Sequence, residues 1–353
     1  MPSKAATMRA PRPVVLGFIA AVVVAFLIPL GLTLFMRVDE PTGPSPATPV
    51  PDGTFTIAVL PDTQYATAAD VDPDASVLFE QTTWLAVNKD ALHLHLVLHE
   101  GDVVDAACDP AQWDRAVRAM SLLTTAKIDY LVSAGNHDVR YYEGCTTGDP
   151  VDHPDEFDSA FPLTAARAMG TFGGSYSTTD ARNTYATFRA GDQEFLVLSL
   201  EFGPTAEVAD WALEVTRDHP DAEVILLTHD LIGPDGELRG GASTSTDALP
   251  KPPRLTGAEL WDRLIAPASN IVLTLNGHVV DGTTGRSEAA DASGRPVWRL
   301  LANYQTVGGG VTGDLRLLTV DPAAGSVAVR TYSPVLDRWL TDDANQFTLT
   351  DLW

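Results

Sequence analysis

Aspartate, asparagine and histidine side chains follow two short apolar runs of this sequence, at the points where those runs end. Asp102 and Asp105 lie in the segment G-D-V-V-D after the first run, and Asn136, His137 and Asp138 lie in G-N-H-D after the second. Carboxylate and amide oxygens beside imidazole, with no thiolate among them, suit Mn, Fe or Zn. The two segments therefore predict a metal centre with a histidine available for proton transfer.

Residues 96–138, which contain both segments, have the pattern of a β-α-β unit. A helical pattern separates the two apolar runs and opens at Asp109-Pro110, a favourable cap and first-turn pair. In an open α/β sheet, the loops at the carboxyl ends of parallel strands lie along one edge, where sites form. We therefore expect the polar residues of both loops to converge.

Three further groups of polar residues stand at the ends of predicted strands. Asp62 and Gln64 follow the run 55–60, His229 ends a second run, and His278 ends a third after Gly277. In this order, the five motifs resemble those of the calcineurin-like metallophosphoesterase family. The resemblance covers residues 54–350. Each motif alone is a weak signal, but five in order at strand ends are specific.

The resemblance implies two divalent ions and a phosphate-ester substrate. Asp102 would bridge the two ions, and the remaining implied ligands are Asn136, His229 and His278 for one ion and Asp62 with Gln64 for the other. Two such ions clamp phosphoryl oxygens and activate a water molecule for attack on phosphorus. The implied activity is that of a phosphatase or phosphodiesterase.

Four residues near the implied ions are expected to act without binding them. His137 would protonate or hydrogen-bond the leaving oxygen, with Asp138 orienting its ring. Asp105 either holds a ligand in place from the second shell or only caps a turn. Arg140 directly follows G-N-H-D and either meets the substrate phosphate or pairs with one of the many acids.

Two positions depart from the family's pattern. Gln64 stands where histidine is more usual, and Val280 replaces the second histidine of G-H-x-H. Asp281 either supplies a substitute ligand or is an ordinary turn residue. We expect the ion at Asp62 and Gln64 to be weakly held and, because its ligands are oxygens, to favour Mn over Zn.

Three interpretations of these departures stay open from the sequence. The chain is a two-metal enzyme, an enzyme with a mononuclear site, or a degenerate member that binds a phosphorylated ligand or a protein partner without turnover. Retention of His137 and Asp138 favours an enzyme, because a binding protein has no need of a proton donor.

The amino-terminal part of the chain has the composition of a membrane anchor and a linker. Residues 1–13 are basic, residues 14–35 carry no charge, and residues 36–53 are rich in proline, before the catalytic domain at 54–353. As a helix, the uncharged segment would span about 33 Å. A cleaved secretory signal is the alternative, but the segment is long and lacks an A-x-A-like site. The positive-inside rule then places the domain on the extracytoplasmic side of the cell membrane.

The net charge limits the classes of binding partner, and the cysteine content bears on whether a disulfide forms. Lys and Arg number 23 against 47 Asp and Glu, which gives a net charge of −24. Such a surface repels polyanions, so a nucleic-acid partner is not expected. The only two cysteines, Cys108 and Cys145, lie on the loops after Asp105 and Asp138. In an oxidising compartment they are expected to form a disulfide; two separate buried thiols are the alternative.

The rest of the domain alternates between strand and helix patterns, which supports an α/β fold. The resemblance implies two sheets packed as a sandwich and flanked by helices. Predicted strands cover 55–60, 92–98, 129–134, 194–200, 222–228 and 270–276, and antiparallel strands cover 297–302, 315–320 and 326–332. Predicted helices cover 75–90 with Asp74 as its cap, the segment after Asp109, 205–218 and 257–265.

Two groups of residues have a structural and a functional interpretation. Scattered aromatic residues between 140 and 189 form either a substrate-binding wall or an ordinary loop. His93, His95 and His99 fit no ligand position of the family, so a structural role is expected for all three.

Overall fold

The computed structural model describes residues 44–69, 72–139, 156–240, 253–307 and 312–353. The expected basic segment 1–13, the expected membrane helix 14–35 and the first part of the linker lie outside these residues. Among the described helices, none combines the length and the apolar character that a membrane crossing requires.

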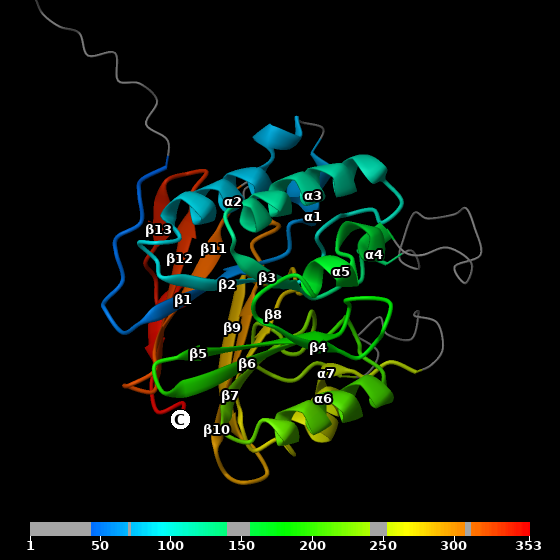
Figure 1. Ribbon diagram of the computed structural model, residues 1–353, viewed down its shortest axis with the longest axis vertical. Coiled ribbons are helices and arrows are strands. Elements are labelled where there is room, and N and C mark those ends of the chain that lie inside the picture. The colour runs from blue at the N-terminus through cyan, green and yellow to red at the C-terminus, as the bar shows by residue number, and fades with distance from the viewer. Residues whose placement is uncertain (1–43, 70–71, 140–155, 241–252, 308–311) are drawn as a thin grey trace, which may run out of the picture. The chain divides into compact units, whose positions relative to one another are not determined.

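Two mixed sheets of seven strands each form the described domain (Figure 1). The first sheet runs in the order β13 (Arg338–Leu340), β12 (Ser326–Ser333), β11 (Leu315–Asp321), β1 (Phe55–Leu60), β2 (Leu94–His99) and β3 (Asp129–Val132), with β14 (Gln346–Leu349) also paired to β12. The second sheet runs in the order β4 (Phe172–Ser175), β5 (Thr184–Ala190), β6 (Gln193–Ser199), β7 (Ala222–Leu227), β8 (Ile271–Asn276), β10 (Pro296–Ala302) and β9 (Thr284–Ala290).

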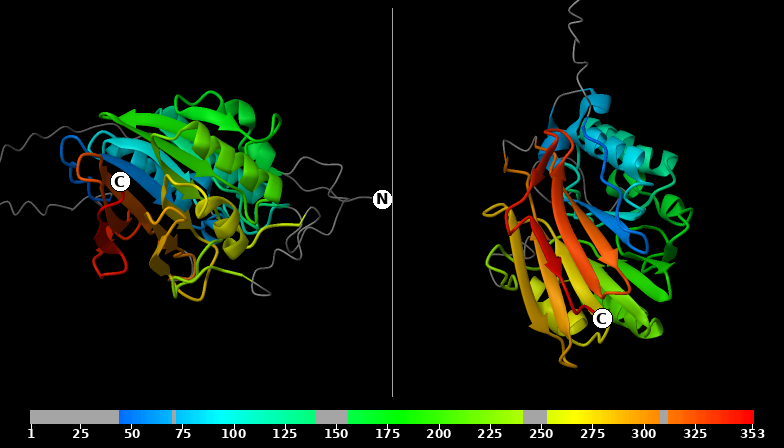
Figure 2. Two further views of the ribbon diagram at one scale, coloured as in Figure 1. Left: turned by 90° about the horizontal axis from the view of Figure 1, so that it is seen from below. Right: turned by 90° about the vertical axis from the view of Figure 1, so that its left-hand side faces the viewer.

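Helices cover the outer faces of the two sheets (Figures 1 and 2). On the side of the first sheet lie α1 (Gln64–Ala68), the 3₁₀ turn η1 (Pro73–Ala75), α2 (Val77–Asn88), α3 (Pro110–Thr125), α4 (Glu156–Ala160) and α5 (Leu163–Ala166). On the side of the second sheet lie α6 (Ala206–Asp218), α7 (Gly257–Leu260) and the π-helical turn η4 (Trp261–Ile265). The described domain is therefore layered helix, sheet, sheet, helix.

The core consists of three apolar clusters, one between the sheets and one under each helical layer. Strand β1 shows the division, because successive side chains of a strand point to opposite faces. Phe55, Ile57 and Val59 pack between the sheets, whereas Ala58 and Leu60 pack under α2 and α3. A strand buried on both faces has a continuous apolar sequence. The prediction of an α/β sandwich of two sheets flanked by helices is confirmed.

The sequence correctly predicts the amino-terminal cap of α3 but not that of α2. Asp109 caps α3 as expected, since its side chain accepts a hydrogen bond from Ala111 N at 2.9 Å. The expected cap at Asp74 is wrong. Ser76 Oγ accepts from the first turn of α2, while Asp74 pairs with Arg118 at 2.6 Å. A hydroxyl at the last extended residue competes successfully for the free N–H groups.

Strand β10 corrects the expected grouping of the carboxyl-terminal strands. It pairs antiparallel with β9, but it also pairs parallel with β8 in the second sheet. Its carboxyl end therefore lies at the same edge as those of β7 and β8. Strands β11 and β12 pair antiparallel as expected, and they belong to the first sheet.

Candidate metal centre

The five sequence motifs meet where parallel strands of both sheets end. Asp62, Asp102 and Asn136 follow β1, β2 and β3 of the first sheet, and His229 and His278 follow β7 and β8 of the second. The first three strands are parallel to one another, as are the last two. Their loops therefore share one edge of each sheet, as the sequence predicts. Each sheet contributes part of the site.

Asp102, His229 and His278 form the group best placed to hold a metal ion. One ligand atom from each of the three lies within 4.8 Å of the others. His229 Nε2 lies 3.3 Å from Asp102 Oδ1, 3.2 Å from His278 Nδ1 and 3.1 Å from Asn136 Oδ1. The other ring nitrogen, His229 Nδ1, lies 2.7 Å from the backbone oxygen of Glu100. That contact orients the ring and leaves Nε2 for a metal, the usual arrangement around histidine ligands.

The backbone at this group adopts a conformation that most residues avoid. Asp102 has a φ of 48° and His278 has a φ of 68°, which places both in the left-handed region. Strain of this kind costs about 1–3 kcal/mol per residue and concentrates at functional sites. It directs two side chains from different sheets toward His229.

Two motif glycines allow this close approach. A Cβ atom at Gly135 would overlap the carboxylate of Asp102, and a Cβ atom at Gly277 would overlap the carboxylate of Asp62. Only glycine lets the backbone come this near. The glycines of G-N-H-D and G-H are therefore part of the site's geometry.

Charge interactions within the group match the needs of metal ligands. Burial raises the pKa of Asp102, but the charge and hydrogen bond of His229, with the charges of His137 and His278, together lower that pKa. Burial lowers the pKa of His229, but the charge and hydrogen bond of Asp102, the charge of Asp62 and the backbone of Glu100 together raise that pKa. Burial and the charge of His229 together lower the pKa of His278 to about 4, so His278 is neutral at neutral pH. A divalent ion among these groups would take the place of the shared proton.

Asp62 and Gln64 form the second predicted ligand pair, and Asp62 adjoins this group at the backbone of His278. The carboxylate of Asp62 accepts hydrogen bonds from His278 N at 3.1 Å, from Asn303 Nδ2 at 3.0 Å and from Gln305 Nε2 at 3.3 Å. Gln64 is buried, and its Oε1 has no hydrogen-bond partner in the described part of the chain. A buried acceptor without a partner is costly. A cation beside Gln64 would relieve that cost, so the amide fits a ligand role.

His137 lies at the edge of the metal group. Its side chain is 24% exposed, its backbone N–H donates to Asp102 Oδ1 at 2.9 Å, and its Nδ1 lies 2.8 Å from the backbone oxygen of Asp105. The carboxylate of Asp105 is 3.6 Å from the same ring nitrogen. These contacts suit a proton donor held by Asp105, whereas the sequence suggested that Asp138 orients the ring.

Asp138 has different partners in the structure. Its carboxylate accepts backbone hydrogen bonds from Val103 at 2.8 Å, Val104 at 3.1 Å and Gly135 at 2.8 Å. Burial, followed by the charge of Asp102, raises the pKa of Asp138 to about 7. Asp138 thus fastens the loop after β2 to the loop after β3. Its predicted role toward the His137 ring stays a prediction.

Several predicted residues fall outside the group or outside the described residues. Arg140 and Cys145 lie in the segment 140–155, which is not described. Cys108 is not a free thiol, and its disulfide with Cys145 stays a prediction. Val280 is 47% exposed, and the neighbouring Asp281 is also exposed and outside the metal group.

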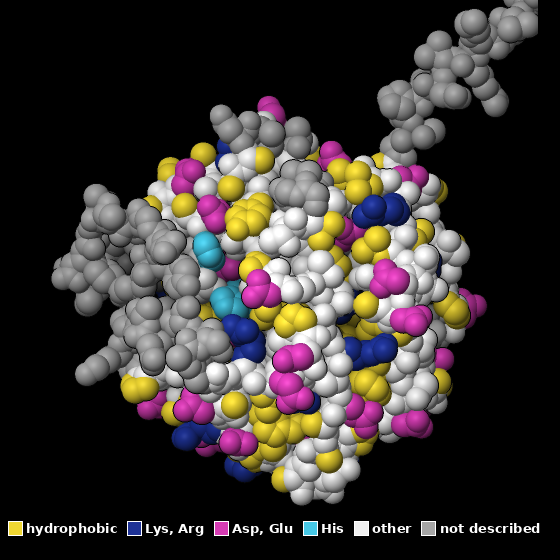
Figure 3. All heavy atoms as spheres, turned by 180° about the vertical axis from the view of Figure 1, so that it is seen from behind, with side chains coloured by type: hydrophobic (Ala, Val, Ile, Leu, Met, Phe, Trp, Pro, Cys, Tyr) yellow, Lys and Arg dark blue, Asp and Glu magenta, His cyan; other side chains and the backbone are white. Residues whose placement is uncertain are grey.

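The site reaches the surface of the domain. The side chain of His278 is 15% exposed and that of His137 is 24% exposed. Figure 3 shows a face on which histidine side chains gather beside acidic and basic ones. A substrate group can therefore approach the ligand atoms from solvent.

The structure adds three residues that the sequence analysis missed. Phe202 follows β6, and its ring centroid lies 5.1 Å from that of His278 and 5.7 Å from that of His229. Asn303 and Gln305 follow β10 and donate to Asp62. All three stand just after a strand with a parallel neighbour, which is the signal that identified the other motifs.

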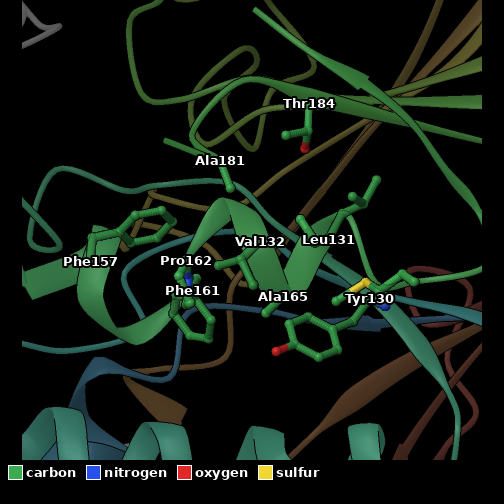
Figure 4. Close-up of a pocket in the computed structure, with 11 residues that line it drawn as sticks. Tyr130, Leu131, Val132, Phe157, Phe161, Pro162, Ala165, Ala181 and Thr184 are labelled. Atoms are coloured by element: carbon green, nitrogen blue, oxygen red, sulfur yellow. Dashed lines mark hydrogen bonds between the residues drawn. The ribbon is translucent and has the colours of Figure 1, made fainter. Parts of the chain in front are cut away.

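Two aromatic residues of the region 140–189 are part of the apolar core. Phe157 and Phe161 are buried against Trp113. Both also line a small pocket with Leu131 and Val132, beside α4 and α5 (Figure 4). For these two residues the structural interpretation holds.

The three histidines before the G-D-V-V-D segment also lie outside the metal group. His99 is buried and lies 3.0 Å from Thr63 Oγ1, and burial lowers its pKa to about 3. It is therefore a neutral histidine of the core, as expected.

Comparisons with known proteins identify one curated relative and several solved structures that are similar to this chain. No protein-family model matches the chain. Over 285 residues, 79% of this chain, it is 32% identical to the uncharacterized protein YvnB of Bacillus subtilis (strain 168), and it spans only 20% of that relative's length. The name of that relative states no activity.

Two solved structures are similar to the chain at low sequence identity. Purple acid phosphatase PPD1 from yellow lupin seeds matches 87% of this chain and 55% of its own, with 14% identity and a TM-score of 0.48. The calcineurin-like phosphoesterase YfkN from Bacillus subtilis matches 84% of this chain and 90% of its own, with 12% identity and a TM-score of 0.41.

Proposed function

We propose that this chain is a metal-dependent phosphoesterase. One observation carries the proposal: ligand atoms of Asp102, Asn136 and His278, from three loops, lie within 3.3 Å of His229 Nε2, and His137 lies beside them. Nitrogen and oxygen donors in this mixture suit a divalent transition metal. Bound there, such an ion supplies stabilisation of phosphoryl charge and activation of water at neutral pH.

The chain's own groups would position the ester and move the proton. His137 Nδ1 faces the backbone oxygen of Asp105, which accepts its hydrogen. Nε2 is then left to carry the proton that the leaving oxygen needs. Phe202 packs against both metal-group histidines and limits how far their rings turn. The phosphate ester would bind between His137 and the metal group.

The two metal positions are proposed to differ in strength. The position at His229 and His278 has four donor groups close together. The position at Asp62 and Gln64 has one carboxylate whose oxygens already accept several hydrogen bonds, one neutral amide and the shared Asp102. We therefore propose a firmly held ion at the first and a weak, Mn-preferring ion at the second.

The proposed activity is tested by hydrolysis of a generic aryl phosphate and an aryl phosphodiester. Activity should increase with added Mn beyond one equivalent per chain, while elemental analysis finds about one firmly bound ion. Asp102→Asn should lose both the bound ion and the activity, because the neutral amide removes the charge that holds the metals. The exposed Asp343→Asn is the matched control.

Three outcomes would contradict parts of this proposal. Metal binding without hydrolysis of either substrate would favour a non-catalytic member that binds a phosphorylated ligand. Full activity at one equivalent of metal would favour a mononuclear enzyme. Retention of metal and activity in Asp102→Asn would rule out the assigned centre.

We also propose that residues 14–35 anchor the chain in the cell membrane with the domain outside. The support is the uncharged segment, its basic flank and the proline-rich linker. Protease added to intact cells should release a fragment that begins in residues 38–53 and keeps the aryl phosphatase activity. A mature chain that already begins after residue 36 in untreated cells would show a cleaved signal instead.

A further inference from the structure

A second group of buried oxygen atoms surrounds a small cavity beside the candidate metal centre. Gln81 from α2, Gln305 after β10 and Asp314 before β11 all line this cavity, together with Asp62. Its volume is about 20 Å³, which is room for about one water-sized particle. Gln81 and Asp314 belong to none of the motifs, whereas Asp62 is one of the ligands assigned above, so this group adjoins the metal centre through Asp62.

The oxygen atoms at this cavity lack partners. Gln81 Oε1, Gln305 Oε1 and both carboxylate oxygens of Asp314 are buried and accept no hydrogen bond from the described residues. The three residues are only 2%, 4% and 3% exposed. Arg338 Nη2 lies 3.9 Å from Asp314 Oδ1, beyond hydrogen-bond distance. Buried polar atoms without partners are costly, and a buried charge more so.

The orientation of both amides is fixed by their nitrogen atoms. Gln81 Nε2 donates to the backbone oxygen of Asp314 at 3.3 Å, and Gln305 Nε2 donates to Asp62 Oδ2 at 3.3 Å. Turning either amide over would lose that hydrogen bond. In each amide the nitrogen is therefore used as a donor, and the oxygen remains as an acceptor without a hydrogen bond.

We propose that this cavity binds one hard cation, with Ca²⁺ as the best fit. Four acceptor oxygens with no nitrogen or sulfur ligand exclude a preference for Zn. Ca²⁺ takes carboxylate and amide oxygens in flexible geometry, whereas Mg²⁺ demands near-ideal octahedral geometry and is seldom bound by a dedicated cage of protein oxygens. A single water has only two hydrogens for four acceptors, and the only charge near Asp314 among the described ion pairs is that of Arg338 at 3.9 Å.

The proposed cation is linked to the metal centre through one side chain. Gln305 presents its oxygen to the cavity and its nitrogen to Asp62. A cation on the oxygen polarises the amide and strengthens the hydrogen bond to Asp62. The site would thus steady a predicted ligand of the weaker metal position without touching the substrate. The proposal does not depend on the phosphoesterase activity.

The test uses thermal unfolding of the full chain carrying Asp102→Asn, so that the catalytic metals are removed as a source of stability. After chelator treatment, CaCl₂ should raise the melting temperature at an ionic strength held constant with choline chloride. Adding Asp314→Asn should abolish this shift, and adding the exposed Asp343→Asn should leave it unchanged. Arg338→Met should enlarge the shift, because it removes a competing positive charge.

Two results would overturn the proposal. The first is the absence of a Ca²⁺ shift in the Asp102→Asn background, which would leave a water-filled cavity. The second is a shift that persists undiminished in Asp314→Asn, which would indicate diffuse binding to the acidic surface. If Asp314→Asn fails to fold, Arg338→Met decides, and a shift equal to that of the parent chain then counts against the site.

Discussion

Replacing His137 with alanine should lower kcat by about 10²–10⁴-fold, the usual contribution of general acid–base catalysis. The metal content should stay unchanged. His137 contacts Asp102 through its backbone N–H, which alanine retains, and its side chain lies outside the metal group. Measuring kcat on an aryl phosphate together with elemental analysis of the same sample separates the two effects.

The matched control for this substitution is His95→Ala. His95 is an exposed histidine near the amino end of β2, whereas Asp102 follows the carboxyl end of the same strand. Its replacement should change neither kcat nor metal content. If His137→Ala loses metal in proportion to activity, His137 is a ligand and the assigned role is wrong.

Replacing Gly277 with alanine should lower activity by about 10²-fold or more, the cost of misplacing reacting groups by about 1 Å. The added methyl group would occupy the position of the Asp62 carboxylate. His278 would also shift, because its backbone N–H donates to that carboxylate. Both metal positions are thereby disturbed, so bound metal should decrease with activity.

Gly170→Ala provides the comparison for this substitution. A Cβ atom at Gly170 would meet only Asp129 Oδ2 at 3.6 Å, an ordinary contact. Its metal content and activity should equal those of the parent chain. Normal metal binding by Gly277→Ala would mean that Asp62 is not held where the structure places it.

The strands that carry the metal group could be predicted from the sequence because they are buried on both faces. Strands β1 and β8 are buried along their whole lengths, so each appears as a continuous apolar run that ends at a polar motif. Parallel pairing then brings the motif loops together. Parallel pairing accounts for the loops within each sheet, whereas the resemblance to the calcineurin-like family joined His229 and His278 to Asp102 and Asn136 in one site.

Partly exposed strands could not be predicted in the same way. Strand β9 has the sequence T-G-R-S-E-A-A and lies at the edge of its sheet, with buried and exposed positions mixed. Strands β4 and β5 combine glycine, threonine and aromatic residues and were therefore attributed to a loop. Without a second buried face, the apolar signal of a strand is lost.

Because β9 cannot be predicted, two residues near the metal group cannot be predicted either. Because β10 pairs with β9 on one side and with β8 on the other, its parallel partner could not be deduced from its own sequence. Asn303 and Gln305 were consequently not recognised as residues at a site edge. The contact between His137 and Asp105 depends on the path of an irregular loop, which periodicity does not describe.

The division of the metal group between the two sheets has a consequence for how the protein would lose its activity. Asp102 and Asn136 come with one sheet, and His229 and His278 come with the other. A bound ion therefore acts as a cross-link between halves that each keep their own hydrogen-bonded strands. If the packing between the two sheets loosened, the proposed activity would be lost while the strands of each sheet persisted. Activity would therefore report on the interface between the sheets, whereas far-ultraviolet circular dichroism would not.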